Sequence, residues 1–376
     1  MQILRRLSLA TTIRIKKGNR IMDIKIQLTS TPKQKPETAE LGFGKHFTDH
    51  MFIMDYTRDK GWHDARIVPF ANLELHPACT VFHYGAEIFE GLKAYRTAEG
   101  KVQLFRPEEN IKRMNSSADR MSLPLLDEKD ALEALTKLIE VEQDWVPSAP
   151  GTSLYIRPFL FGADPFLGVH SINRSMFVII LSPVGSYYKE GINPVKIMIE
   201  TEDVRAVRGG TGYTKCGGNY GASNRAGEKA EKKGFSQVLW LDGIERKYIE
   251  EVGAMNVMFK IGDEVVTPAL TGSILPGITR KSCIELLKSK GVKVSERLIS
   301  IDELIEALEN GTLKEGWGCG TAAVVSPIGE LHYNDKKYVI NDNKIGETTQ
   351  ELYDTLTGIQ WGRLEDTYNW TYPITK

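Results

Sequence analysis

The sequence lacks a long apolar run, a close pair of cysteines and a large excess of one charge. Its longest strongly apolar stretch is Met176–Leu181, whereas a helix needs roughly 20 apolar residues to span a bilayer. No membrane association is therefore expected. The four cysteines, Cys79, Cys216, Cys283 and Cys319, lie far apart. This pattern favours free thiols in a reducing compartment and supports neither a disulfide framework nor a zinc knuckle.

The formal net charge of −1 over 376 residues hides a basic leader. Residues 1–22 contain six lysines and arginines and no acid, whereas the rest of the chain has 42 basic and 49 acidic residues. A mildly acidic body argues against nucleic acid as a partner, because phosphate contacts need a clustered cationic surface. The leader resembles a mitochondrial transit peptide. Met22 makes a misassigned start an equally good explanation, and the protein is then expected in the cytoplasm.

Length and composition favour two mixed α/β domains. Hydrophobic residues make up 41% and charged residues 26% of the chain, which is ordinary for a globular protein. The segment 183–194, PVGSYYKEGINP, interrupts both strand and helix periodicity and carries turn residues at each end. We therefore expect a basic extension at 1–22, a small domain at 23–184, a linker at 185–195 and a large domain at 196–376.

Strand and helix patterns are mixed through both halves. An amphipathic helix follows Asp127, and its apolar face would be Ala131, Leu132, Leu135, Leu138 and Ile139. A hairpin is expected across Gly262-Asp263. Further strands are predicted at 101–106, 152–161, 176–182, 195–200 and 236–241. Further helices are predicted at 222–233, as an exposed helix, and at about 279–289 and 302–309.

The densest chemical signal is the glycine-rich stretch 209–221, GGTGYTKCGGNYG, with Lys215 in its middle. Glycines let a backbone approach a ligand closely and expose N–H groups to an anion. The stretch is not a Walker A loop, because Cys216 follows the lysine where that loop needs Ser or Thr. A carbonyl compound could reach the amine of a lysine among glycines, as a Schiff-base nucleophile requires. A flexible surface loop with a solvated lysine explains this segment equally well.

Three other segments could contact a ligand. Glu251 precedes an apolar run in EEVGAMN (250–256), where a partly buried carboxylate would need a cationic partner. LPGITR (275–280) begins a helix whose first N–H groups could bind phosphate. GCGTAA (318–323) could offer backbone N–H groups to an anion, although its likeness to a dinucleotide fingerprint is treated as accidental. His46 and His50 have the spacing of a helical metal clasp, but no third ligand is evident.

Together these segments resemble the branched-chain amino-acid aminotransferases, which are fold-type IV pyridoxal-phosphate enzymes. The likeness runs from about Phe43 to the C-terminus. Its carriers are FGKHFTDHM (43–51), HYGAEIFEGLKAY (83–95), LFRPEENIKRM (104–114), LYIRP (154–158), KCGGNYG (215–221), EEVGAMN (250–256), LPGITR (275–280) and GCGTAA (318–323). Each is short, but eight in one order make a chance match improbable. The resemblance implies a two-domain α/β (mixed α+β) transaminase fold with the active site between the domains.

The resemblance implies a pyridoxal 5′-phosphate site. Lys215 would be the Schiff-base lysine and would move the proton from the substrate Cα. A free lysine titrates near about 10.4, so the site must lower this pKa by desolvation and by the nearby cationic cofactor. Glu251 would hydrogen-bond the pyridine nitrogen and Tyr220 the ring hydroxyl. The phosphate would be bound by Arg113, Ile278, Thr279 and Thr321.

The resemblance also implies the substrates, L-leucine, L-isoleucine and L-valine, with 2-oxoglutarate as acceptor and L-glutamate as product. An apolar pocket would reject glutamate unless a cation paired with its side-chain carboxylate, and Arg157 would supply that cation. Ala322 would offer its N–H group to the substrate α-carboxylate. The other pocket residues implied are Phe43, Phe89, Tyr155 and Tyr187, together with Tyr84 and Val169. The last two reach the opposite subunit's pocket in this family, which implies a homodimer.

Two positions depart from the family pattern. Ala323 and Ser326 stand where animal members carry a redox-active CxxC pair, and Ala254 stands where many members have Thr or Ser. Two near alternatives share the fold, a D-amino-acid aminotransferase and an aminodeoxychorismate lyase. A nucleotide-binding protein or kinase is the alternative from another class, and the absent Walker A lysine pattern counts against it.

Overall fold

The computed structural model describes residues 11–13, 22–185 and 192–374. The chain divides into two compact units, Met1–Gly185 together with Tyr372–Lys376, and Ser186–Thr371. Most of the leader predicted at 1–22 and of the linker predicted at 185–195 lies outside the described residues. The C-terminal domain expected at 196–376 includes Tyr372–Lys376, which the contacts place in the first unit instead. Strand β19 (Thr371–Ile374) follows β7 (Val102–Phe105) in the strand order of that unit's sheet.

The N-terminal unit is built on a ten-stranded sheet in the order β1-β2-β4-β3-β9-β8-β6-β7-β19, with β5 beside β8. Its longest pairing is antiparallel, from Ser153 opposite Val184 to Gly162 opposite Ser175. The strands predicted at 101–106, 152–161 and 176–182 are confirmed. The strands are β1 Thr11–Ile13, β2 Ile24–Ile26, β3 His50–Thr57, β4 Gly61–Pro69, β5 Glu87–Phe89, β6 Leu92–Arg96, β7 Val102–Phe105, β8 Ser153–Gly162, β9 Arg174–Val184 and β19 Thr371–Ile374.

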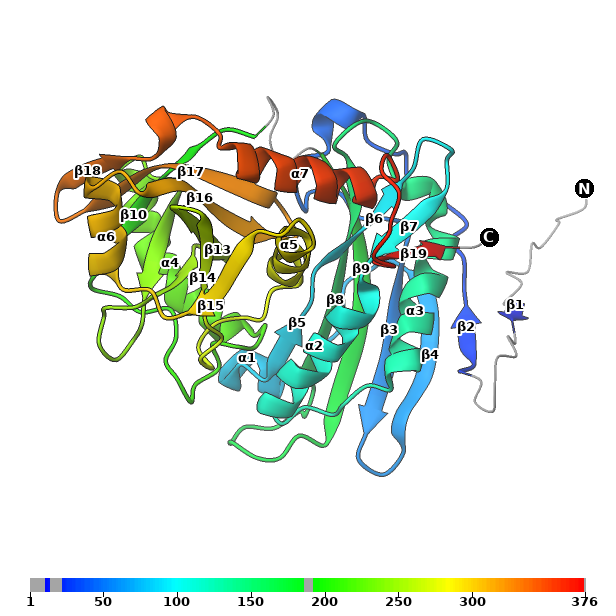
Figure 1. The fold of residues 1–376 in the computed structure, drawn as a ribbon. Helices are drawn as coiled ribbons and strands as arrows, with labels where there is room; N and C mark the ends of the chain where they lie inside the picture. The colour runs from blue at the N-terminus through cyan, green and yellow to red at the C-terminus, as the bar shows by residue number, and fades with distance from the viewer. Residues whose placement is uncertain (1–10, 14–21, 186–191, 375–376) are drawn as a thin grey trace, which may run out of the picture. The chain divides into compact units, whose positions relative to one another are not determined.

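Two long helices, α2 and α3, lie beside the strands of this unit (Figure 1). The Asp127 carboxylate accepts hydrogen bonds from the backbone N–H groups of Lys129 and Asp130, which caps α3 where the sequence predicts its start. The buried face includes Ala134 and leaves Leu132 half-buried, so the predicted face is wrong at that one position. The helical elements are α1 Thr80–Tyr84, α2 Pro107–Arg120, α3 Glu128–Val141 and the 3₁₀ turns Thr38–Glu40 and Gln143–Trp145.

The C-terminal unit contains a nine-stranded sheet in the order β12-β11-β10-β17-β16-β13-β14-β15, with β18 beside β17. Strand β12 pairs with both β11 and β13, which closes six of these strands into a ring. The hairpin predicted across Gly262-Asp263 is confirmed. The strands are β10 Val195–Ile199, β11 Gln237–Leu241, β12 Ile249–Val252, β13 Met255–Ile261, β14 Glu264–Pro268, β15 Lys293–Arg297, β16 Leu313–Gly320, β17 Val324–Tyr333 and β18 Lys336–Val339.

The helices of this unit confirm two predictions and correct a third. Helices α5 (Ile278–Ser289) and α6 (Ile301–Glu309) lie where expected, but α4 (Gly217–Lys232) begins five residues before the predicted 222. It is also not simply exposed, because Ala226 and Ala230 pack against β11. Packing of this small-residue face compensates for the poor helix propensity of the glycines in the first turns. The remaining elements are α7 Glu347–Gln360 and the 3₁₀ turn Asn341–Asn343.

The described residues hold no helix with both the length and the apolarity to cross a membrane. Within the same residues, no group of three His, Cys, Asp or Glu side chains is placed to bind a metal. The helical spacing considered for His46 and His50 is wrong, because His50 is the first residue of β3. Its Nε2 accepts from the Thr29 N–H group, and its Nδ1 contacts Glu142. The four cysteines are buried and free.

Candidate active site

Lys215 lies two residues before α4 and faces the first turn of that helix. Its Nζ donates a hydrogen bond to the Tyr220 hydroxyl at 2.9 Å and lies 5.5 Å from the centre of the tyrosine ring. The lysine is half-buried. The Lys215 side chain is therefore neither fully exposed nor sealed in the core.

The loop that carries Lys215 is held by a side chain that the sequence analysis did not select. The Asn219 amide donates to the carbonyl oxygens of Thr211 and Thr214 at 2.8 and 2.9 Å, and its oxygen accepts from the Thr211 hydroxyl at 2.8 Å. The close packing of this loop against Ser273 also requires glycine at position 212, because an added Cβ would lie 2.2 Å from the Ser273 carbonyl oxygen. The interpretation of this segment as a flexible surface loop is therefore wrong.

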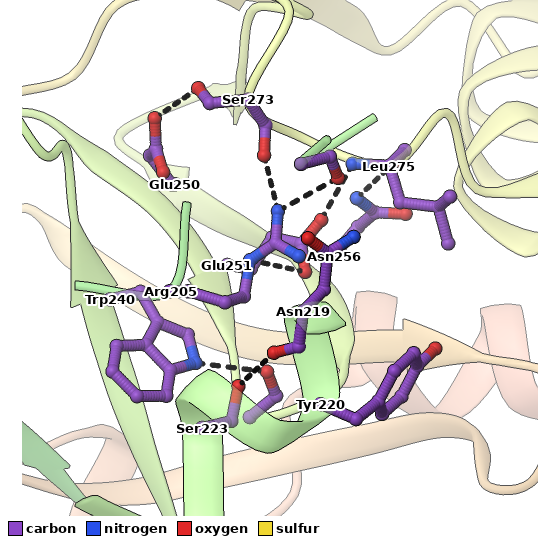
Figure 2. Close-up of polar contacts among 12 residues, drawn as sticks. Arg205, Asn219, Tyr220, Ser223, Trp240, Glu250, Glu251, Asn256, Ser273 and Leu275 are labelled. Carbon is purple, nitrogen blue, oxygen red and sulfur yellow. Dashed lines mark hydrogen bonds and ion pairs between the residues drawn. The ribbon is translucent and has the colours of Figure 1, made fainter. Parts of the chain in front are cut away.

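Glu251 is buried in β12, with 3% of its surface exposed, and its two oxygens have different partners. Oε1 accepts from the Leu275 N–H group at 2.8 Å, and Oε2 lies 3.3 Å from Nε of Arg205 (Figure 2). The sequence predicted a buried carboxylate with a cationic partner. Arg205 is that partner, and no local signal singled it out, because it lies in an irregular segment far from Glu251 in the chain.

The neighbouring acid, Glu250, has a different environment. Successive strand residues point to opposite faces, and the Glu250 carboxylate accepts from the Ser273 hydroxyl rather than from a second cation (Figure 2). Burial raises the pKa of Glu250 above its ordinary value, although this hydrogen bond and Arg205 act in the opposite direction. Burial therefore makes Glu250 harder to ionise than an exposed glutamate.

A cavity of about 150 Å³ adjoins these groups. Its lining includes Tyr220 from α4, Glu251 from β12 and Leu275 from the loop before α5. Ala254, the position where the family often has a hydroxyl, also lines it. The departure at Ala254 thus changes the wall of this cavity.

The start of α5 lies close to the same strands. Gly277 is its N-cap and has no side chain to cap the helix, and an added Cβ would lie 1.9 Å from Oδ1 of Asn256. Asn256 also donates to the Leu275 carbonyl oxygen at 2.9 Å, and Cys319 of β16 is its partner in the sheet. Asn256 thereby links the loop that leads into α5 with β16, the strand that precedes the turn of Thr321 and Ala322.

In the N-terminal unit, Arg113 is fixed by a carboxylate. Its Nε and Nη2 donate to the two oxygens of Glu90 at 2.7 and 2.9 Å, and Asn110 donates to the same carboxylate at 2.8 Å. Both members of the ion pair are buried. This bidentate geometry restricts the direction of the guanidinium.

Four predicted substrate residues lie together in the N-terminal unit. Arg157 donates to the Tyr155 hydroxyl at 2.9 Å and stacks over the Phe89 ring at 4.5 Å. Phe43 meets the Tyr155 ring edge-on at 4.9 Å. Gly91, which the sequence analysis missed, leaves room for Tyr155, since a Cβ there would lie 2.1 Å from its hydroxyl.

Tyr84 and Val169 lie on the surface of the N-terminal unit. The Tyr84 hydroxyl accepts from the Gly168 N–H group at 2.7 Å, which connects α1 to the loop between β8 and β9. Val169 is 87% exposed, and three further exposed apolar side chains belong to the same two segments, Phe82, Phe166 and Leu167. Tyr187 lies outside the described residues.

Comparison with known proteins places the chain in a family. Residues 87–331 match the family described as amino-transferase class IV. The chain is 58% identical over 351 residues to branched-chain-amino-acid aminotransferase 2 of Bacillus subtilis (strain 168), covering 93% of this chain and 97% of the relative. It is 54% identical over 354 residues to a probable branched-chain-amino-acid aminotransferase of Staphylococcus aureus (strain N315), covering 94% and 99%.

Solved structures of such enzymes have the same fold. The branched-chain amino acid aminotransferase of Escherichia coli matches with a TM-score of 0.73 at 25% identity, over 87% of this chain and 99% of that one. The enzyme of Thermobaculum terrenum, solved in its PLP-form, matches with a TM-score of 0.68 at 21% identity, over 86% and 98%. The chain therefore belongs to the class IV aminotransferases and, within them, to the branched-chain-amino-acid aminotransferases.

Proposed function

We propose that this protein uses pyridoxal 5′-phosphate to transfer the amino group of L-leucine, L-isoleucine or L-valine to 2-oxoglutarate, which yields L-glutamate. The observation that carries the proposal is the pairing of the Lys215 amine with the Tyr220 hydroxyl, beside a cavity that Tyr220 shares with the buried Glu251. Of the two relatives described above, one is named a branched-chain-amino-acid aminotransferase and the other a probable one, which supports the choice of amino donor.

The residues of the C-terminal unit fit this cofactor by their chemistry. Lys215 would hold its aldehyde carbon through Nζ, Glu251 would accept a hydrogen bond from the ring nitrogen, and Tyr220 would contact the ring hydroxyl. The first N–H groups of α5 and the turn at Thr321 offer donors to a phosphate. We also assign Arg113 to the phosphate, because a guanidinium suits a dianion. When bound, the cofactor supplies an electron sink for charge that develops at the substrate Cα.

Lys215 would also move a proton. Its Nζ would take the proton from the substrate Cα, which requires the neutral amine. Tyr220 has no covalent role in this proposal. Its hydroxyl lies 2.9 Å from Nζ and orients the amine toward the cavity.

Both kinds of substrate can be accommodated by the Phe43, Phe89, Tyr155 and Arg157 cluster. The aromatic rings would contact the branched apolar side chains, and Arg157 would pair with the side-chain carboxylate of glutamate. Nε of Arg157 is buried and has no hydrogen-bond partner within the described part of the chain. An unmet buried donor is costly, and a carboxylate would satisfy it. Ala322 would donate its N–H group to the substrate α-carboxylate.

A homodimer is part of the proposal. The exposed apolar side chains of α1 and of the loop between β8 and β9, with Tyr84 and Val169 among them, form a surface that contact with a second subunit would bury. Tyr187 is assigned to the pocket from the resemblance alone, and the predicted place of the active site between the domains stays a prediction. The relatives named above are bacterial, which gives no support to the transit-peptide interpretation of the leader.

The visible absorption spectrum of the purified protein tests this function. The band of the lysine-bound cofactor should disappear when leucine is added and return with 2-oxoglutarate. Lys215→Ala should lower kcat at least about a thousandfold, whereas Lys233→Ala, at the exposed end of α4, should leave kcat unchanged. A colourless protein, or full activity in Lys215→Ala, would contradict the proposal. D-Alanine as a better amino donor than leucine would favour a D-amino-acid aminotransferase instead.

A further inference from the structure

Arg205 contacts three segments that belong to the candidate site. Its Nε lies 3.3 Å from Oε2 of Glu251, and its Nη2 donates to the carbonyl oxygens of Gly212 and Ser273 (Figure 2). Gly212 belongs to the loop that carries Lys215, and Ser273 to the loop that leads into α5. The guanidinium is therefore oriented by backbone groups, and its remaining edge faces the carboxylate.

Glu251 is held from a second side as well. Its Oε1 accepts from the Leu275 N–H group at 2.8 Å, and the Leu275 carbonyl oxygen accepts in turn from Asn256 at 2.9 Å. A carboxylate that accepts a backbone hydrogen bond from one segment and lies in an ion pair with an arginine of another has little rotational freedom. Both contacts also favour its ionised form.

The charge balance around β12 supports the same assignment. Glu250 and Glu251 are adjacent and buried, and Arg205 lies within ion-pair distance of Glu251. Glu250 contacts the Ser273 hydroxyl instead, and burial raises its pKa above the ordinary value. The direct ion pair of Arg205 is therefore with Glu251.

We propose that Arg205 is a positioning residue for the cofactor: it keeps Glu251 ionised and directs it toward the pyridine nitrogen. This inference rests on the proposed function, because it assigns the ring nitrogen to Glu251. Arg205 also lines the cavity beside Tyr220 and Glu251, but the proposal assigns it no direct contact with the cofactor. Replacing Arg205 should therefore weaken the binding only of those cofactors whose ring can accept and hold a proton at that position.

This dependence on the ring nitrogen distinguishes a positioning role of Arg205 from a structural role. Pyridoxal phosphate and its 1-deaza analogue share the aldehyde, the hydroxyl and the phosphate, but a C–H group replaces the ring nitrogen in the analogue. The affinity of the cofactor-free protein for each can be measured by quenching of tryptophan fluorescence. The ratio of the two dissociation constants then reports the contact of Glu251 with the ring nitrogen and not the general integrity of the site.

Arg205→Met should reduce the preference for pyridoxal phosphate over the deaza analogue roughly tenfold or more, the range of a hydrogen bond to a charged group. The affinity for the analogue should change less than about threefold. Arg205→Lys keeps the charge and should lose only part of the preference. Arg208→Met, an exposed arginine in the same loop, is the matched control and should retain the wild-type ratio.

The outcomes distinguish the two proposals. An equal loss of affinity for both ligands in Arg205→Met would assign Arg205 a structural role, and an unchanged ratio would deny it any role. If Arg205→Met does not fold, Arg205→Lys and Glu251→Gln are compared, and an unchanged ratio in both overturns the inference. If the wild-type protein binds pyridoxal phosphate but transfers no amino group from leucine, the proposed function fails while the ratio still tests Arg205.

Discussion

Each unit buries an arginine beside a glutamate, but the two pairs are built differently. Arg113 meets Glu90 through two nitrogens, at 2.7 and 2.9 Å, so the carboxylate orients the arginine. Arg205 meets Glu251 through one contact at 3.3 Å, and carbonyl oxygens bind its Nη2 group. In the second pair the backbone orients the arginine, and the arginine orients the acid.

The two regions also differ in charge balance. The Arg113–Glu90 pair contains one cation and one acid, whereas Glu250 and Glu251 are adjacent buried acids, and Arg205 forms an ion pair with Glu251. Taking a charge out of water is costly, and burial raises the pKa of Glu250 above its ordinary value. Removing one partner of a short buried ion pair should therefore change the stability more than removing a buried acid that has no ion pair of its own within the described residues. Substitutions of Glu90, Asp127 and Glu250 test this difference.

The largest effect is expected from Glu90→Gln. The substitution leaves the buried Arg113 charge without its carboxylate, and breaking a buried pair in this way costs about 3–5 kcal/mol in the free energy of unfolding. Urea unfolding of the cofactor-free protein, followed by tryptophan fluorescence, measures the loss. Glu108→Gln removes an exposed acid of the same helix as Arg113 and should change the free energy by no more than about 0.5 kcal/mol.

The double variant Glu90→Leu with Arg113→Met tests whether the unpaired charge of Arg113 causes the loss of stability in Glu90→Gln. Replacing both charges with apolar groups removes the unpaired charge, so the double variant should be more stable than Glu90→Gln. It should still lose cofactor affinity, because Arg113 is assigned to the phosphate. A double variant less stable than Glu90→Gln would show that packing or polar contacts, and not the unpaired charge, dominate the cost.

An intermediate loss of stability is expected from Asp127→Ala. This substitution measures the contribution of an exposed acid that has no buried cation as its partner. The carboxylate caps α3 through the N–H groups of Lys129 and Asp130, and loss of such a cap costs about 1 kcal/mol. Asp127→Asn keeps an acceptor at the same place and should retain most of the stability. Equal losses in the two variants, measured by thermal unfolding, would contradict a capping role.

The smallest effect at low pH is expected from Glu250→Gln. Burial raises the pKa of Glu250 above its ordinary value of 4.5, so the folded protein holds this proton to higher pH than the unfolded chain does. The stabilisation is complete below the ordinary pKa and is lost as the pH rises through the raised value. Glutamine cannot ionise, so the stability of the variant should fall less with rising pH than that of the wild type.

Urea midpoints of Glu250→Gln and the wild type, measured across a pH series, report this difference. The two proteins should converge at acidic pH and separate as the pH increases. Parallel curves would mean that the pKa of Glu250 is the same in the folded and in the unfolded protein. Burial would then have no net effect on the ionisation of this acid, which would contradict the prediction.

Local signals predicted much of the fold. Strands β8 and β9 followed from runs of β-branched and aromatic residues, and α3 followed from Asp127 and the apolar spacing after it. The start of α4 could not be predicted in this way, because its first turns are rich in glycine. Burial of Ala226 and Ala230 against β11 compensates for that low propensity, and such packing involves residues distant in the chain.

By itself, the sequence determined whatever depends on neighbouring residues: the periodicity of the strands and helices, the glycines around Lys215, and the eight segments that resemble one enzyme family. Only the tertiary structure decided which charges meet. Glu90 and Arg113 are 23 residues apart, Arg205 and Glu251 are farther still, and no spacing rule connects either pair. Ion pairing depends on distance and burial in three dimensions, so the partner of a buried acid becomes known only when the strands are assembled.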